Sequence, residues 1–358
     1  MAVALAAGKL RNLKALTDDR GRFTMMAIDQ RGSLLSALGK VLGRPAADIG
    51  YEELAATKEV ITRVLSPYAS AVLTDPEYGI PASAKAIPGH VGLLVACEAT
   101  GYDRAGANGK ERLSKLVPGW SAEKTARCGA NAVKLLVYYN PDASEDTRRH
   151  QQELVRRVGE DAVRWGLAFL LELVSYPLAE PSADSSEFAR RKPELVARSA
   201  QEFSKPEYQV DVLKLEFPAN LKFAREYCRG VFDRMDREPV YALDQVRDYC
   251  RRVNEAAALP WVILSAGVDI AEFLVEVELA TAAGASGFLC GRAIWKNAVS
   301  FYPDLGAMEA NLSTEGVYNF VRCNAAAQMA LPWHCHQRFG GLGNVEVANA
   351  GPGWAQAF

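Results

Sequence analysis

Short apolar runs recur along the chain, and segments with helical spacing separate them. Eight of these runs are typical of buried parallel strands, because strands covered on both faces are apolar without interruption. They span residues 24–28, 71–74, 92–96, 132–138, 168–174, 212–217, 261–265 and 287–290. Apolar residues recur every three or four positions in residues 51–65, 145–165, 185–203, 243–258, 269–283 and 308–329, which predicts helices there.

Repeated alternation of strand and helix predicts an α/β fold, a (β/α)8 TIM barrel. A doubly wound open sheet is the alternative, but no GxGxxG motif follows the first strand. The second and third strands are close in sequence, so the helix between them must be short. Residues 9–17 are expected to form a helix that closes the bottom of the barrel, and Ser144 is the expected N-cap of helix 145–165.

The chain has 358 residues, which a single barrel with insertions can account for. We expect one (β/α)8 barrel domain over residues 1–330 and a C-terminal extension of unknown role over residues 331–358. The extension contains five glycines after residue 338 and few charges. For residues 338–358 a loosely ordered tail is the favoured interpretation, with a lid or a subunit contact as alternatives.

Two lysines lie inside apolar strand-like runs, where lysine is rarely found unless it is paired. Lys134 and Lys214 are each flanked by valine or leucine on both sides. An ammonium group that is removed from water has a lowered pKa, and the neutral amine can attack a carbonyl to form a Schiff base. These residues therefore indicate covalent carbonyl chemistry, although a single such lysine could instead reach solvent past the barrel rim.

Carboxylates accompany the two lysines. Glu172 is the one charge in run 168–174, and Lys134 on the neighbouring strand is its expected partner. Glu216 follows Lys214 by two positions, which predicts that both face the same side of the strand. A structural ion pair is the alternative, but buried pairs add little net stability. Two lysines and a glutamate on three successive strands therefore favour catalysis.

The first two strands end in polar residues, and in a barrel of this kind the C-terminal ends of the strands form the active site. Asp29, Gln30 and Arg31 follow the first strand and could bind polar substrate groups, or could form only a capped turn with a surface ion pair. Asp75 precedes a proline after the second strand, and here a simple turn is favoured.

The last two strands end in small residues. Ser265 and Gly267 follow the seventh strand, and Gly291 and Arg292 follow the eighth. Small residues let backbone N–H groups approach an anion, and the loops after strands seven and eight are the usual phosphate site in these barrels. A turn with a surface arginine is the alternative, but both loops carry suitable residues, so we expect a phosphate site.

Composition and charge exclude several classes of function. The net charge is −2 with both signs interspersed, so neither a nucleic acid nor a membrane is an expected partner, and a small molecule is. Seven cysteines at irregular spacing, with no CxxC, indicate a reduced cytoplasmic protein. Of the four histidines, only His334 and His336 stand close together, so we expect no metal site and no cofactor.

In chain order, these motifs resemble the class I tagatose-1,6-bisphosphate aldolases, which are DeoC/LacD-like aldolases. The motifs are Asp29-Gln30-Arg31-Gly32, Asp75-Pro76-Glu77-Tyr78-Gly79, Ala132-Val133-Lys134, Leu171-Glu172, Asp211-Val212-Leu213-Lys214, Leu264-Ser265-Ala266-Gly267-Val268 and Leu289-Cys290-Gly291-Arg292. The resemblance implies a (β/α)8 barrel and metal-free Schiff-base cleavage of a ketose 1,6-bisphosphate to dihydroxyacetone phosphate and glyceraldehyde 3-phosphate. Barrels of this kind commonly pair, so a homo-oligomer is expected.

The resemblance also implies a role for each site residue. Lys214 would form the Schiff base, Glu172 would help to dehydrate the carbinolamine, and Asp29 would handle the proton during carbon–carbon cleavage. Lys134 would belong to the same catalytic pocket. The implied substrate-binding residues are Gln30, Arg31, Ser265, Gly267, Gly291 and Arg292.

Several alternatives stay open at this point. Sulfofructosephosphate aldolases resemble this family closely and use the same lysine, so the group at C6 could be a phosphate or a sulfonate. The stereochemistry of the sugar and the number of subunits are open as well. A metal-dependent barrel aldolase and a non-catalytic metabolite sensor are the remaining alternatives; few histidines argue against the first, and the complete set of acids and lysines argues against the second.

Overall fold

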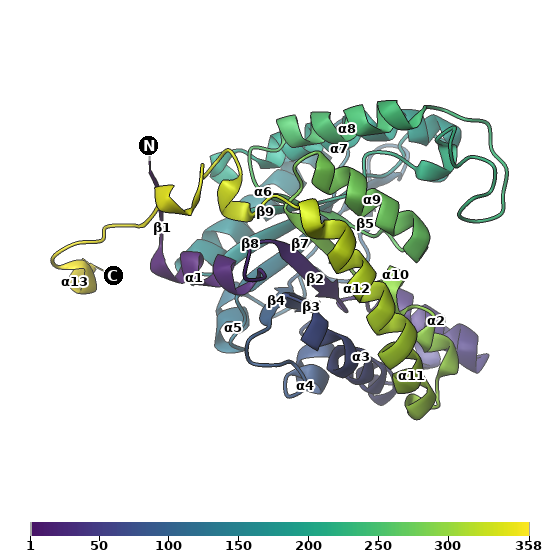
Figure 1. Cartoon of the computed structure of the whole chain (residues 1–358), viewed down its shortest axis with the longest axis horizontal. Coiled ribbons are helices and arrows are strands. Elements are labelled where there is room, and N and C mark those ends of the chain that lie inside the picture. The colour runs from purple at the N-terminus through teal and green to yellow at the C-terminus, as the bar shows by residue number, and fades with distance from the viewer. Residues whose placement is uncertain (1, 358) are drawn as a thin grey trace.

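Eight parallel strands close into a barrel in the computed structural model, which describes residues 2–357 (Figure 1). Met1 and Phe358, at the outer limits of the two expected ranges, lie outside the described residues. In barrel order the strands are β10 (Trp261–Leu264), β11 (Gly287–Cys290), β2 (Phe23–Ala27), β3 (Ala71–Thr74), β4 (Gly92–Ala96), β7 (Ala132–Tyr138), β8 (Ala168–Val174) and β9 (Val212–Leu215). The predicted TIM barrel is therefore confirmed, and the open sheet is excluded.

Alternate residues of each strand belong to two different apolar clusters. In β8, Ala168 and Leu170 belong to the cluster that fills the barrel and its floor. Phe169, Leu171 and Leu173 belong to the larger cluster between the strands and the surrounding helices. Because side chains in a strand point to opposite faces in turn, this division fixes which positions face the barrel interior.

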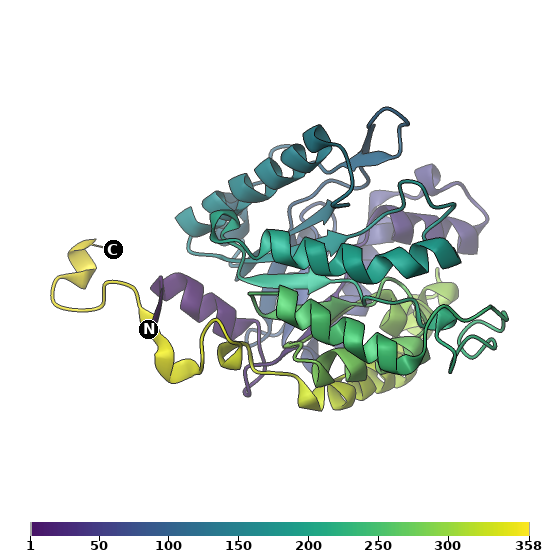
Figure 2. The same ribbon diagram turned by 90° about the horizontal axis from the view of Figure 1, so that it is seen from above.

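Helices cover the outside of the barrel, as the view from above shows (Figure 2). They are α1 (Ala7–Ala15), α2 (Gly32–Leu42), α3 (Tyr51–Leu65), α4 (Gly79–Ser83), α5 (Ala122–Arg127), α6 (Glu145–Arg164), α7 (Ser186–Phe203), α8 (Leu243–Ala256), α9 (Ile270–Ala282), α10 (Arg292–Trp295), α11 (Leu305–Asn311) and α12 (Val317–Ala326). The helix between β3 and β4 is short, as the sequence requires. Ser144 caps α6 by accepting a hydrogen bond from the backbone N–H of Thr147.

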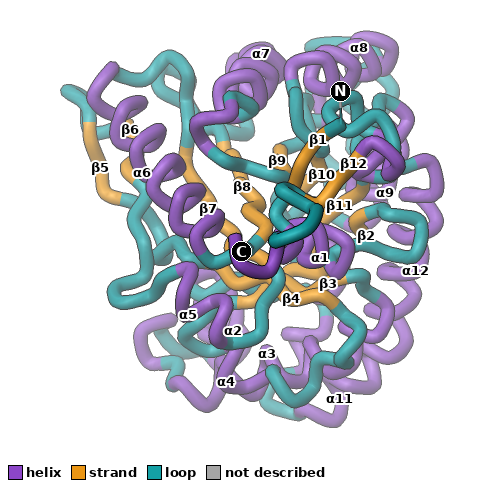
Figure 3. The backbone as a smooth tube through the Cα atoms, turned by 90° about the vertical axis from the view of Figure 1, so that its left-hand side faces the viewer, coloured by secondary structure: helices purple, strands orange, loops and turns teal. Residues whose placement is uncertain are grey.

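Two small sheets lie outside the barrel. β5 (Asp103–Ala105) and β6 (Glu111–Leu113) form an antiparallel hairpin within the connection from β4 to β7. β1 (Val3–Leu5) and β12 (Val345–Val347) pair in parallel, so a segment near the N-terminus lies beside one near the C-terminus (Figure 3). Neither sheet was expected from the apolar pattern, because each strand has only three residues.

The segment after residue 330 forms part of the barrel floor. The side chain of Trp333 is 1% exposed and packs in the interior cluster with Leu13 and Leu16, at the end of the molecule where α1 lies. The expectation of a loosely ordered tail is wrong for residues 338–347, because the buried Phe339 and the pairing of Val345–Val347 with β1 fix this segment. Within residues 2–357, no helix combines the length and the apolar character needed to cross a bilayer.

Candidate active site

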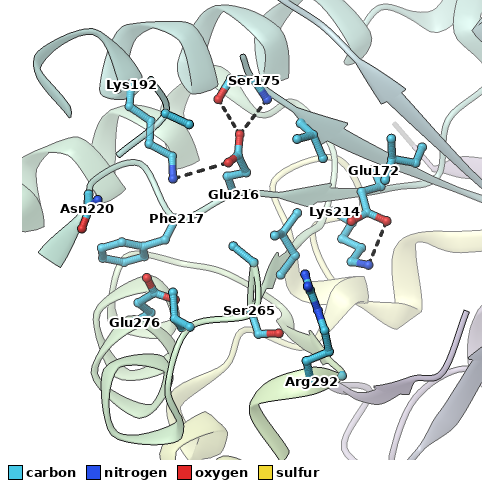
Figure 4. Close-up of a pocket in the computed structure, with 18 of the residues that line it drawn as sticks. Glu172, Ser175, Lys192, Lys214, Glu216, Phe217, Asn220, Ser265, Glu276 and Arg292 are labelled. Atoms are coloured by element: carbon cyan, nitrogen blue, oxygen red, sulfur yellow. Dashed lines mark hydrogen bonds and ion pairs between the residues drawn. The ribbon is translucent and has the colours of Figure 1, made fainter. Parts of the chain in front are cut away.

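Lys134, Glu172 and Lys214 occupy inward-facing positions of the three adjacent strands β7, β8 and β9. Each lies two or four residues after an inward-facing alanine or valine of its own strand, so the strand period points it into the barrel. In the strand register Glu172 lies directly opposite Lys214. Figure 4 shows that these two side chains point toward each other at the wall of the cavity.

Lys134 is the centre of a buried cluster of charges. Its Nζ lies 2.8 Å from Asp29 Oδ2, 2.5 Å from Glu98 Oε1 and 2.8 Å from Glu172 Oε2. The Lys134 side chain is 1% exposed, and the three carboxylates are at most 10% exposed. The expected pairing of Lys134 with Glu172 is confirmed, and two further acids share the same ammonium group.

The charges in this cluster set one another's ionisation. Burial opposes the ionised forms of Asp29 and Glu172, but the ammonium groups of Lys134 and Lys214 outweigh it and lower the pKa of both carboxyls. Burial dominates at Glu98 and raises its pKa despite Lys134. Burial also disfavours the charged form of Lys134, yet the surrounding carboxylates raise its pKa well above the ordinary value. Lys134 is therefore a permanent positive charge beside two ionised acids.

Lys214 has a different environment from Lys134. Its Nζ donates a hydrogen bond of 2.9 Å to Glu172 Oε2, the same oxygen that Lys134 contacts. Its side chain is 5% exposed and lines a cavity of about 490 Å3. Lys134 thus has three carboxylate partners, whereas Lys214 has one and lines this cavity.

The loops after β10 and β11 line the same cavity. Ser265, Gly267, Gly291 and Arg292 all contribute to its wall. Gly267 has φ of +80°, and a Cβ there would lie 2.9 Å from Cζ of Arg292, so glycine lets the guanidinium rest against the backbone. A Cβ at Gly291 would lie 2.8 Å from the carbonyl oxygen of Ala27. The two loops therefore meet closely beside a cationic side chain, which is the arrangement expected for an anion site.

A second lobe of about 320 Å3 adjoins the first cavity and shares Glu172, Lys214 and Arg292 with it. Gln30 lines both lobes, and its Oε1 is buried without a hydrogen-bond partner among the described residues. Arg31 lines only the second lobe. Its guanidinium binds the Glu77 carboxylate and the backbone carbonyl of Glu98, and its side chain is 6% exposed. The structure thus brings all ten of the predicted site residues to one divided cleft.

Glu98 was missed by the reasoning from sequence. It follows the inward-facing Ala96 of β4 by two residues, so the same period of two would have pointed it into the barrel. Its carboxylate also accepts a hydrogen bond of 3.0 Å from the backbone N–H of Leu136, which holds β4 and β7 together at the site.

Asp75 forms the turn that the sequence favours, and it has a second role that the sequence did not reveal. Its carboxylate accepts a hydrogen bond of 2.8 Å from the backbone N–H of Tyr78. It also pairs at 2.6 Å with Lys58, and neither side chain of that pair is exposed. Burial lowers the pKa of Lys58. Lys58 lies on α3, outside both lobes of the cleft, so this pair supports the structure and not the site.

Glu216 does line the cavity, as its spacing from Lys214 implies, but it does not contact Lys214. Its Oε2 accepts a hydrogen bond of 2.7 Å from the backbone N–H of Ser175, and its Oε1 lies 3.4 Å from Nζ of Lys192 (Figure 4). The expected same-side arrangement therefore places Glu216 in a separate ion pair at the edge of the cavity.

Fold and site together define the class of protein: a (β/α)8 barrel enzyme whose cleft combines a buried lysine–carboxylate cluster with two loops that meet beside an arginine. Residues 23–297 match the model of the DeoC/LacD family aldolases. The chain is 38% identical over 337 residues to tagatose 1,6-diphosphate aldolase 2 of Enterococcus faecalis, covering 93% of this chain and 97% of that protein. It is 35% identical over 336 residues to tagatose 1,6-diphosphate aldolase of Lactococcus lactis subsp. lactis, covering 92% and 99%.

Solved structures share the fold at lower identity. A fructose-bisphosphate aldolase from Plasmodium falciparum superposes with a TM-score of 0.65 at 13% identity, over 92% of this chain and 98% of that chain. A Schiff-base-forming fructose-1,6-bisphosphate aldolase superposes with a TM-score of 0.51 at 19% identity, over 84% and 97%. The chain belongs to the DeoC/LacD family of aldolases, and it is a carbon–carbon lyase.

Proposed function

We propose that the protein is a class I aldolase that cleaves tagatose 1,6-bisphosphate to dihydroxyacetone phosphate and glyceraldehyde 3-phosphate. The observation that carries the proposal is the 2.9 Å contact between Lys214 Nζ and Glu172 Oε2, inside a cavity of about 490 Å3 that Arg292 also lines. The names of the relatives at 35–38% identity support tagatose 1,6-bisphosphate as the substrate.

Lys214 is the nucleophile in this proposal, and Lys134 is not. Three carboxylates surround the Lys134 ammonium within 2.8 Å, and its pKa is raised, so it keeps its proton. Lys214 has one carboxylate partner and lines both lobes of the cleft. Lys214 therefore has a proton acceptor and also faces the larger cavity, which Lys134 does not line.

Schiff-base formation begins with a proton transfer from Lys214 to Glu172. The free amine of Lys214 attacks C2 of the ketose, and the new C–N bond gives a carbinolamine. Glu172 then returns its proton to the C2 hydroxyl, which leaves as water, and the iminium forms. Lys134 remains charged beside Glu172 throughout, which disfavours protonated Glu172 and so promotes the return of its proton to the C2 hydroxyl.

Carbon–carbon cleavage uses the iminium as an electron sink. Asp29 or Glu172 accepts the proton of the C4 hydroxyl, the C3–C4 bond breaks, and its electron pair moves into the enamine on Lys214. The aldehyde product leaves from the far side of that bond. Protonation at C3 and addition of water to the iminium then release dihydroxyacetone phosphate and restore Lys214. Asp29 suits the role of base because its pKa is lowered, so it is ionised at neutral pH.

The loops after β10 and β11 position the substrate. We assign the C1 phosphate to Ser265, Gly267, Gly291 and Arg292, with Gln30 beside them. Fixing the phosphate places C2 next to Lys214, and such positioning contributes at most about 7–11 kcal/mol to lowering a barrier. The second lobe, which Asp29 and Arg31 line together with Glu172 and Lys214, is assigned to the hydroxyl groups at the reacting bond.

Borohydride trapping tests the proposal. Incubation with dihydroxyacetone phosphate and borohydride is expected to add a reduced adduct to one peptide, at Lys214, and Lys214→Met is expected to remove both the adduct and turnover. Lys192→Met is the matched control, because Lys192 lines the same cavity without contacting Glu172. An active enzyme with no adduct, or an enzyme that loses activity to a chelator, would contradict a Schiff-base mechanism.

A substrate panel tests the sugar. Tagatose 1,6-bisphosphate, fructose 1,6-bisphosphate and 6-deoxy-6-sulfofructose 1-phosphate differ in stereochemistry or in the group at C6, and each gives a distinct product pattern. A preference for the sulfonate substrate would move the assignment to a sulfofructosephosphate aldolase of the same mechanism. The homo-oligomeric state and the cytoplasmic location remain predictions.

A further inference from the structure

We propose that Arg112, on the β5–β6 hairpin, binds the anionic group at the far end of the substrate. This inference rests on the proposed function, which requires a second oxyanion at C6. It names the residue that recognises this oxyanion, a phosphate or a sulfonate, and so determines which ketose 1-phosphates are good substrates.

The order of strands in the barrel places Arg112 across from the C1 phosphate site. In an eight-stranded barrel, β4 and β7 lie on the opposite side from β10 and β11. The hairpin that carries Arg112 arises within the connection between β4 and β7. Arg112 lines the cavity of about 490 Å3 together with Lys214 and Arg292. A chain held at Arg292 and bonded to Lys214 therefore extends toward Arg112.

The charge of Arg112 is not neutralised by the fold. In the described chain its guanidinium contacts rings and no carboxylate: Cζ lies 4.5, 5.1 and 4.9 Å from the ring centroids of Tyr102, Tyr138 and Tyr176. Arg104 lies directly opposite it in the hairpin register, and like charges in that relationship destabilise a strand pair. Arg104 lies outside the cavity and adds to the positive charge of the hairpin, which an anionic ligand at Arg112 would offset.

Arg31, the other arginine near the reacting groups, is already engaged. Its guanidinium binds the Glu77 carboxylate and the backbone carbonyl of Glu98. An anion would have to compete with both partners to bind Arg31. Arg112 has no such competitor, so it is the better candidate for the distal group.

The backbone around Arg112 is anchored to the barrel. Gln151 on α6 donates a hydrogen bond of 2.8 Å to the Arg112 carbonyl. The Glu111 carboxylate accepts a hydrogen bond of 3.0 Å from the backbone N–H of Ser144, and Ser114 Oγ accepts one of 3.1 Å from that of Tyr138. These contacts hold the guanidinium in position before a ligand arrives, which lowers the entropy lost on binding.

The chemistry of the guanidinium fits a tetrahedral oxyanion. Stacking against tyrosine rings uses the face of the guanidinium and leaves the N–H groups in its plane available. These N–H groups form a fork that donates two parallel hydrogen bonds to phosphate or sulfonate. Both groups present the oxygen pair that the fork requires, so Arg112 is expected to accept either.

The test compares three substrates with wild type, Arg112→Met and Arg112→Lys. Arg112→Met keeps the side-chain length without charge, and Arg112→Lys keeps the charge without the fork. Arg322→Met is the matched control, because Arg322 is also stacked on a tyrosine, Tyr318, but lies on α12 outside the cleft. The substrates are tagatose 1,6-bisphosphate, 6-deoxy-6-sulfofructose 1-phosphate and tagatose 1-phosphate, which has no distal anion.

Arg112→Met is expected to lower kcat/KM for tagatose 1,6-bisphosphate by roughly 10- to 100-fold, the value of a lost hydrogen bond to a charged group. Its kcat/KM for tagatose 1-phosphate is expected to stay close to wild type, and Arg112→Lys to fall in between. The sulfonate substrate shows whether the site favours phosphate or sulfonate. Arg322→Met is expected to match wild type on all three.

Two results would overturn the inference. Equal losses on tagatose 1,6-bisphosphate and tagatose 1-phosphate would give Arg112 a structural role only, and unchanged kinetics would give it none. Trapping of dihydroxyacetone phosphate by borohydride, which needs no distal anion, reports whether each variant is folded. A wild-type enzyme that traps no adduct and cleaves none of the substrates would instead refute the proposed function, and the inference with it.

Discussion

Lys134 and Lys214 bind the same carboxylate oxygen: Glu172 Oε2 lies 2.8 Å from one Nζ and 2.9 Å from the other. One acid therefore serves two cations with different access to the cleft. Since Lys134 keeps its proton, it stabilises the ionised form of Glu172 and so resists the first proton transfer from Lys214. The same charge favours the return of that proton to the leaving hydroxyl.

Replacing Glu172 by Gln is expected to lower kcat by about 10²- to 10⁴-fold, because the glutamine cannot shuttle a proton in dehydration of the carbinolamine. Rapid-quench measurement of the borohydride-trapped iminium would show slower formation of the adduct. Glu216→Gln is the control, since Glu216 lines the same cavity without contacting either Lys134 or Lys214. An equal loss of kcat in Glu172→Gln and Glu216→Gln would contradict a specific role of Glu172 in proton transfer.

Loss of Lys134 should destabilise the fold more than loss of Lys214. Lys134→Met leaves Asp29 and Glu98 without their cation, and breaking a buried pair in this way costs about 3–5 kcal/mol. Lys214→Met leaves Glu172 still paired with Lys134, so its cost is expected to be smaller. Urea unfolding of the two variants measures the difference, and equal midpoints would contradict the cluster described here.

The contribution of Asp29 to stability should depend on pH in one direction. Its pKa in the folded protein is lowered from the ordinary value of 3.8. Stability from such a carboxyl is fully present above the unfolded pKa and is lost as the pH falls through the folded pKa. Asp29→Asn is therefore expected to differ most from wild type in urea midpoint at neutral pH, and the two curves should converge below about pH 4. A difference that grows in acid would contradict the sign of the shift.

The Lys58–Asp75 pair offers a test of structural support away from the cleft. Lys58→Met leaves Asp75 buried without its cation, at a cost of about 3–5 kcal/mol. Activity per folded molecule is expected to persist, because neither residue lines either lobe of the cleft. Lys115→Met is the control, since its pair with Asp103 is exposed and little stability should be lost.

The floor of the barrel should be sensitive to Trp333. Trp333→Ala is expected to lower the free energy of unfolding by about 3–5 kcal/mol, because it removes a large side chain that is 1% exposed. Tyr318→Ala on α12 is the control, since Tyr318 is 62% exposed. Thermal or urea unfolding measures both, and a neutral Trp333→Ala would show that residues beyond 330 are dispensable.

The strands and most helices could be predicted from sequence, because burial on both faces leaves an unbroken apolar run. The period of two within a strand then placed Lys134, Glu172 and Lys214 on one interior face. The same rule could have located Glu98. That residue lies two positions after the end of β4, outside the apolar run from which the strand is predicted. Its contact with Lys134 is a tertiary contact between two separate segments of the chain, which the local sequence pattern does not predict.

The remaining features depend on contacts between distant segments. The β5–β6 hairpin has three-residue strands of mixed polarity, so the apolar pattern does not predict it. The environment of Arg112 is formed by tyrosine rings from three other segments of the chain. The glycines near the C-terminus indicated disorder, whereas pairing with β1 fixes Val345–Val347. The composition of residues 338–358 does not predict that a strand at the other end of the chain pairs with them.

The pairing of β1 with β12 has a consequence for biosynthesis. Val3 leaves the ribosome early, but its partner Val345 is added on the order of half a minute later at about 10 residues per second. Until then the floor of the nascent barrel lacks Trp333, and Leu13 and Leu16 are without this packing partner. The barrel floor is therefore completed only near the end of synthesis, and a translation product truncated before residue 333 is expected to be less stable than the full chain.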